Sequence, residues 1–108
     1  MTYHTNYPKN LDIAFSSLYI QNRTRPISIA NIKFRIIRLQ SGESTDLTSP
    51  DENGLKMCSV SRGRVKVKIS GRKFSIGADG MWRVRGGETC RVRNQLSEEA
   101  VVHVSDVV

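Results

Sequence analysis

The sequence predicts an all-β domain in which antiparallel strands form a sandwich or a barrel. At least six short segments alternate apolar and polar residues, and turn-forming residues separate them at spacings of roughly 8 to 12 residues. The chain has 108 residues, 38% of them hydrophobic, which suits one domain with a single core.

The first part of the chain, residues 1–26, is predicted to be an N-terminal arm, and residues 27–108 are predicted to be the folded domain. Three apolar residues of the arm have the i, i+4, i+7 spacing of one helix face: Leu11, Phe15 and Leu18. Serines and β-branched residues in the same segment oppose a helix, so a short helix and an irregular edge strand both stay open. Pro26 ends the segment in either case.

From Ile27 onward the apolar period changes to two. Ile32, Phe34 and Ile36 alternate with other side chains, so we expect them to form the buried face of the first strand. A long polar loop is expected at residues 41–54, where proline and glycine punctuate the chain.

The later strands follow from the same alternation and from glycine-containing turns between them. The segments at 81–84 and 89–95 are joined through a short connection that contains Gly86 and Gly87. The expected strands are residues 55–61, 65–70, 74–76, 81–84, 89–95 and 101–108.

Basic residues are concentrated in the second half of the chain. The net charge is +7, and eleven lysines and arginines lie between Lys56 and Arg93 against two carboxylates, Asp79 and Glu88. This field favours acidic partners such as nucleic acid or an acidic peptide. Solvated strand faces give the same pattern, so that interpretation also stays open.

Several other classes of protein lack support in the sequence. No apolar run approaches the roughly 18 residues of a membrane span, and the first residues lack the apolar stretch of a signal peptide. Cys58 and Cys90 form no CxxC pair, so we expect free thiols and no zinc site.

The segment from residue 54 to residue 94 resembles a cupin domain, which is a small jelly-roll barrel. Gly87, Cys90 and Asn94 keep the spacing of the second cupin signature. Cys90 stands at the histidine position of that signature, and Arg85 stands at its proline position. The resemblance therefore implies a cupin jelly-roll barrel or sandwich of antiparallel strands.

The residues at the metal-binding positions of that resemblance differ from those of metal-dependent cupins. Alignment on Gly63 places Lys56 where such a cupin has its glutamate, and an ammonium repels a cation. His4 and His103 lie outside both signatures. We therefore expect no metal ligand, no catalytic residue and no cofactor, and a protein that is not an enzyme.

A more specific resemblance links the second half of the chain to the C-terminal cupin domain of the CENP-C/Mif2 family of centromere proteins. The resemblance covers roughly residues 30–106, where Arg85 to Glu88 replace Pro-Arg-Gly-Asn and Cys90 replaces an aromatic residue. The residues that match the family's phrase are Phe74, Ile76, Gly80, Trp82, Val84, Gly87 and Asn94.

This resemblance implies a homodimerisation and partner-recruitment domain of a kinetochore scaffold in the nucleus. The implied partners are a second copy of the chain and peptide segments of other centromere, kinetochore or histone-loading proteins, with a weak DNA contact and no membrane. Two alternatives stay open: a small-molecule-binding or metal-dependent cupin, and a basic DNA-binding β-barrel.

Candidate dimer residues follow from strand parity and from apolar residues on polar faces. If Cys90 and Lys56 point inward, Leu55 and Met57 point outward, although a slip of one residue exchanges the two sets. Trp82 is expected in the core, with an interface anchor as the alternative. A second apolar patch is expected to consist of Ile37, Leu39, Leu11, Phe15 and Leu18. Either the N-terminal segment of the same chain or that of its partner would cover this patch.

Candidate partner-binding residues are basic or line the expected pocket. Lys56 is expected to reach a carboxylate or the pocket mouth. Cys90 is assigned to the same pocket. Four arginines lie on the two neighbouring segments at 81–85 and 89–95. If these segments pair with each other, the four form one basic patch for an acidic partner: Arg83, Arg85, Arg91 and Arg93.

Overall fold

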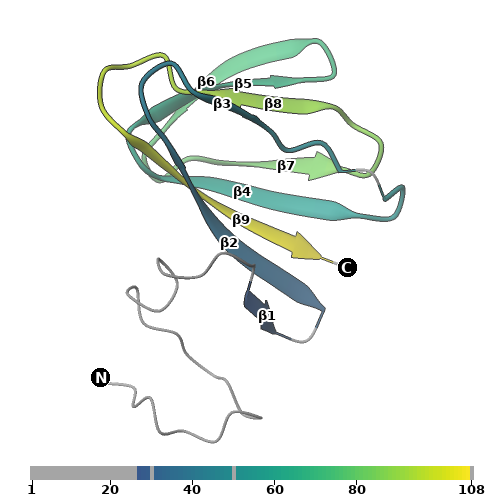
Figure 1. Cartoon of the computed structure of the whole chain (residues 1–108). Helices are drawn as coiled ribbons and strands as arrows, with labels where there is room; N and C mark the ends of the chain where they lie inside the picture. The colour runs from purple at the N-terminus through teal and green to yellow at the C-terminus, as the bar shows by residue number, and fades with distance from the viewer. Residues whose placement is uncertain (1–26, 30, 50, 108) are drawn as a thin grey trace, which may run out of the picture.

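The computed structural model describes residues 27–29, 31–49 and 51–107 of the chain. Within this part, nine strands form two antiparallel sheets (Figure 1), which confirms the all-β prediction. No helix long and apolar enough to cross a membrane occurs in it. The predicted arm, residues 1–26 with Leu11, Phe15 and Leu18, lies outside the described residues. The domain boundary therefore stays a prediction.

The larger sheet has five strands in the order β1-β2-β9-β4-β7. Their bounds are Ile27–Ile29 for β1, Ile32–Leu39 for β2, Ala100–Val107 for β9, Leu55–Arg62 for β4 and Met81–Arg85 for β7.

The smaller sheet has four strands in the order β3-β8-β5-β6. Their bounds are Ser44–Asp46 for β3, Cys90–Arg93 for β8, Arg64–Ile69 for β5 and Arg72–Gly77 for β6. The chain passes from one sheet to the other at almost every connection. The hairpins β1–β2 and β5–β6 are exceptions.

The core lies between the two sheets and consists largely of valines. Alternate residues of β5 are buried and exposed, as the sequence predicts for Val65 and Val67 against Lys66 and Lys68. The largest fully buried apolar side chains are Leu47, Val60, Val65, Val67, Val84, Val92, Val102 and Val104.

Strand β2 corrects one prediction. Ile37 and Leu39 lie opposite Val102 and Ala100 of β9, whose side chains are buried. The inward face of β2 therefore carries Ile37 and Leu39. Ile32, Phe34 and Ile36 lie on the outer face, the reverse of our expectation. The strand has apolar residues on both faces, so its period could not choose between them.

Strand β3 was not predicted, because it falls in the expected polar loop at 41–54. It has three residues, and only the side chain of Thr45 is partly buried. An edge strand that short has no apolar alternation for sequence reasoning to detect. Its pairing with β8 positions Leu47, which is fully buried directly after it.

Candidate interaction surfaces

An ion pair lies inside the roll, and it includes the lysine that the sequence alignment placed at a metal-ligand position. Lys56 of β4 and Asp106 of β9 are register partners, and the ammonium Nζ donates to the carboxylate Oδ1 at 2.5 Å. Their side chains are 11% and 20% exposed, so neither charge is fully solvated. The expected carboxylate partner of Lys56 is therefore present.

The two thiols are buried and reduced. Cys58 and Cys90 are free cysteines, as expected, and each is 1% exposed. Burial, together with the nearby Cys90, raises the pKa of Cys58 to about 12. Burial also raises the pKa of Cys90. Both thiols are neutral at physiological pH and are therefore weak nucleophiles and weak metal ligands.

The inward groups do not fit the metal site of a metal-dependent cupin. Such a site needs neutral imidazoles and a carboxylate that converge on one point. Here the inward groups include the Lys56–Asp106 pair, Arg35 and two neutral thiols, and the two cationic side chains disfavour a metal ion. Among residues 27–29, 31–49 and 51–107, no three His, Cys, Asp or Glu side chains come together as a metal site.

The outer face of the five-stranded sheet carries many apolar side chains, together with Arg38, Ser59, Arg83, Arg85 and Ser105, and we call it the apolar face. The register aligns its side chains in rows across β2, β9 and β4, so Ile32, Val107 and Leu55 form one row. Strand alternation places the following residues on it: Ile32, Phe34, Ile36, Leu55, Met57, Met81, Val101, His103 and Val107.

Two side chains of the apolar face are strongly exposed. Ile32 is 42% exposed and Met81 is 59% exposed. Phe34 and His103 pack edge to face, with ring centroids 5.4 Å apart. Burial, together with the nearby Arg38, lowers the pKa of His103, so the neutral imidazole is the form that suits this face. Within the described residues, no third layer of secondary structure covers the face (Figure 1).

A cleft of about 570 Å³, the edge cleft, lies where the edge strands β6 and β7 of the two sheets face each other. Its apolar wall includes Ile69, Phe74 and Trp82. Its charged residues are Arg72, Arg83, Arg85 and Glu88. Glu88 also accepts a hydrogen bond from the backbone N–H of Arg85 at 2.8 Å, so it is already engaged in the turn.

On β4 the structure has one of the two parities that the sequence left open. Several other candidate dimer residues lie in the core instead of on an outer face. Lys56 is buried, and Leu55 and Met57 are half-buried on the apolar face. Leu39 is 4% exposed and Trp82 is 7% exposed, so both belong to the core. Ile37 packs against the same core. The proposed second patch of Ile37 and Leu39 is therefore wrong.

The candidate basic patch is divided between two sheets. Arg83 and Arg85 lie on β7, which pairs with β4, whereas Arg91 and Arg93 lie on β8, which pairs with β3 and β5. The expected pairing of the two strands does not occur, because the connection between them crosses from one sheet to the other. Cys90 is fully buried and points into the roll, and it does not line the edge cleft.

Sequence reasoning missed most of the apolar face. The signal that could have revealed the apolar face is in β2, which has apolar residues on both of its faces. Phe34 and Ile36 lie on one face, and Ile37 and Leu39 lie on the other. An apolar residue on both faces of one strand indicates that both faces meet other groups.

Comparison with solved structures identifies the fold class as a cupin. The cupin domain of a transcriptional regulator of the XRE family from Enterobacter cloacae is 20% identical, with a TM-score of 0.67 over 72% of this chain and 82% of that one. The Schizosaccharomyces pombe Cnp3 cupin domain is 13% identical, with a TM-score of 0.66 over 76% of this chain and 59% of that one.

A third similar structure is a sugar phosphate isomerase of the cupin superfamily from Silicibacter pomeroyi. It is 12% identical, with a TM-score of 0.66 over 74% of this chain and 52% of that one. The chain matches no family model and no curated protein. At these identities the likeness shows the fold alone, and it confirms the predicted cupin jelly roll.

Proposed function

We propose that this cupin domain is a non-enzymatic module that joins two copies of its chain and recruits peptides of other proteins, as part of a centromere or kinetochore scaffold in the nucleus. The observation that supports it most is the apolar face. Exposed isoleucine and methionine side chains there lie next to half-buried aromatic and aliphatic ones.

The apolar face has a size and composition that suit a two-fold contact. Strands β2, β9 and β4 have eight residues each, so the sheet measures roughly 26 Å along the strands and 20 Å across them. Two such faces together would bury roughly 1,000 Å², which is about the smallest area of a specific interface. A two-fold axis that lies between the two faces and runs parallel to the rows would set each row of apolar residues against its copy.

The edge cleft is the candidate site for recruitment. It combines an aromatic and aliphatic wall with three arginines, and its only carboxylate, Glu88, is engaged by the backbone. This chemistry suits an extended peptide that places one apolar side chain against Phe74 and carboxylates beside Arg83 and Arg85. Dimerisation would present two such clefts, which multiplies weak contacts through effective concentration.

The centromere assignment rests on two supports. The first is the CENP-C/Mif2 resemblance, whose aromatic and aliphatic residues, including Trp82 and Val84, form core contacts here. The second is that a structure of the same fold is the Cnp3 cupin domain, a CENP-C homologue.

Light scattering of the full chain tests the proposal. The wild type is expected to have the mass of a dimer at tens of micromolar, and Met57→Glu is expected to have the mass of a monomer. Gln95→Glu makes the same charge change at an exposed position away from the apolar face, so it should remain a dimer. A monomeric wild type, or a dimer that Met57→Glu leaves intact, would contradict the proposed face.

The isomerase among the similar structures supports a second candidate, a small-molecule or metal-dependent cupin. This candidate predicts that the purified wild type retains a transition metal in stoichiometric amount. The dimerisation proposal predicts no retained metal, together with the mass change described above.

A further inference from the structure

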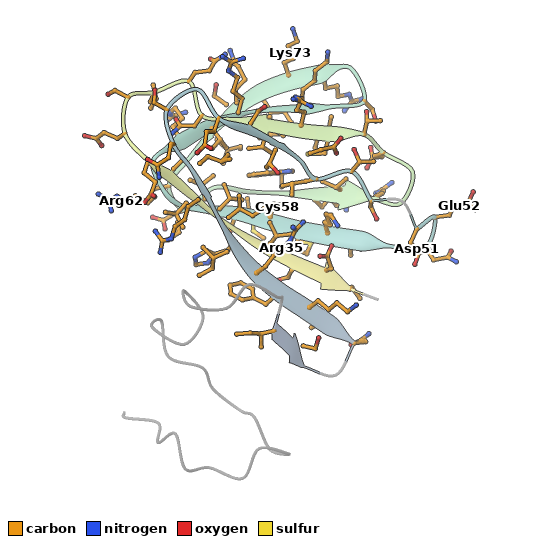
Figure 2. All side chains as sticks on the ribbon, in the orientation of Figure 1. Arg35, Asp51, Glu52, Cys58, Arg62 and Lys73 are labelled. Carbon is orange, nitrogen blue, oxygen red and sulfur yellow. The ribbon has the colours of Figure 1, made fainter. Side chains whose placement is uncertain are left out.

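The outer face of the four-stranded sheet carries an unusual excess of positive charge. Strand alternation places six exposed basic side chains on it, and we call it the basic face: Arg64, Lys66, Lys68, Lys73, Arg91 and Arg93. Figure 2 shows Lys73 projecting away from the body of the molecule. Asp46 is the one carboxylate on the face among the described residues.

The register places like charges directly opposite each other. Lys68 has Arg91 on one side and Lys73 on the other, and Lys66 lies opposite Arg93. Like charges at this separation, about 5 Å, destabilise a sheet. The fold therefore retains a repulsion between cations that an anionic partner would relieve. Solvation of a strand face does not require like charges on directly opposite residues.

Internal carboxylates do not neutralise this charge. Within the described residues the salt bridges are Arg38–Glu99 and Lys56–Asp106, and neither involves the basic face. Asp46 accepts a hydrogen bond from the Thr48 backbone N–H at 2.7 Å. Hydrogen bonds from Thr48 lower the pKa of Asp46, so it stays ionised, but its single charge opposes six cations.

We propose that the basic face binds the phosphate backbone of double-stranded DNA without reading its sequence. Alternate residues of one strand are about 6.7 Å apart, and neighbouring strands are about 5 Å apart. The face is thus a grid of cations on the scale of the phosphate spacing along a nucleic-acid strand. Apart from the cations, the polar side chains that the described strands place on this face are Ser44, Ser75 and Asp46, so the face can contact phosphates and has few groups that distinguish bases.

The side chains of the basic face favour duplex DNA over other anionic partners. The apolar residues of β5 and β8 point inward: Val65, Val67 and Val92 are fully buried, and Ile69 packs against the core. The described strands of the basic face therefore offer no apolar side chain that could insert into a membrane. Single-stranded nucleic acid is usually held by aromatic stacking, and Phe74 lies on the inner side of β6. An acidic peptide would find its apolar anchor at the edge cleft instead.

Fluorescence anisotropy with a labelled DNA duplex of arbitrary sequence tests this inference. If all six cations contact phosphates, the slope of log K against log salt concentration is about −5. The double variant Lys66→Gln, Lys68→Gln is expected to bind more than tenfold more weakly, with the slope reduced in magnitude by about 2. The control, Lys33→Gln with Arg62→Gln, removes the same charge from exposed positions of the five-stranded sheet and should change affinity less than threefold.

Three outcomes would overturn the inference. These are no duplex binding at low salt, equal losses in the two double variants, and tighter binding to anionic vesicles or to a polyglutamate peptide than to the duplex. Thermal unfolding of both variants checks that they fold as the wild type does. The Met57→Glu variant keeps the basic face. Its affinity for the duplex should therefore still fall when Lys66 and Lys68 are replaced, even if the apolar face does not dimerise.

Discussion

Replacing Asn94 with alanine is expected to destabilise the domain by about 2 to 4 kcal/mol. Asn94 is fully buried at the end of β8. Its Nδ2 donates to the carbonyl oxygens of Leu39 at 2.9 Å and Glu98 at 2.6 Å, and its Oδ1 accepts from the backbone N–H of Leu96 at 3.0 Å. The side chain thus ties the β8–β9 loop to the end of β2.

The magnitude follows from what each lost partner can do afterwards. The Leu39 carbonyl belongs to a buried residue and would lack a partner, which costs about 1 to 3 kcal/mol. The Glu98 and Leu96 groups lie near the surface, where water can replace the amide, so each costs about 1 kcal/mol or less. Asn94→Asp keeps the acceptor oxygen but places a carboxylate oxygen next to two carbonyl oxygens. At neutral pH it should therefore lower the free energy of unfolding at least as much as Asn94→Ala does.

Urea unfolding followed by the fluorescence of Trp82, the single tryptophan of the chain, measures the change. All variants are compared at one protein concentration, because a dimer gains stability with concentration. The exposed Asn53→Ala serves as the control and should lie near the wild type. A loss below about 1 kcal/mol for Asn94→Ala would refute the reasoning that this side chain is a structural tie.

Three further predictions concern the ion pair, the histidine and the thiols. Lys56→Met should cost roughly 2 kcal/mol in urea unfolding by leaving Asp106 unpaired, and adding Asp106→Leu should recover most of the loss; no recovery would contradict the pairing argument. The pKa of His103 is lowered from 6.5, so the neutral form is favoured and stability is lost as the pH falls through that lowered pKa. Light scattering should therefore show a weaker dimer in acid, and His103→Gln should remove this pH dependence. The Cys58 thiol, with a pKa of about 12, should react with a thiol reagent at mildly alkaline pH only as fast as the domain opens, and rapid reaction would contradict its burial.

The sequence predicted what depends on local alternation. Val65 and Val67 alternate cleanly with lysines, so both faces of β5 were assigned correctly. On β4 the sequence left two parities open, and the structure has the one that follows from the cupin resemblance, with Lys56 inward and Leu55 and Met57 outward.

The sequence could not predict what depends on pairing between distant segments. The inward face of β2 is selected by β9, which follows about sixty residues later, and both faces of β2 are apolar. Strands β7 and β8 likewise belong to different sheets, because the connection between them crosses from one sheet to the other, and their own residues do not indicate this. For this reason Arg83 and Arg91 were grouped wrongly, and the basic face emerged only from the register of β5, β6 and β8.

The apolar face is the central element of this account, and the distance between two spin labels across the dimer tests it most directly. A label at Met81→Cys lies on the apolar face, and a label at Lys73→Cys lies on the opposite sheet. Because stacked sheets are about 10 Å apart, pulsed electron paramagnetic resonance should give less than roughly 30 Å between Met81 labels and more than roughly 35 Å between Lys73 labels. The reverse order, or no coupling at either position, would contradict dimerisation through the apolar face.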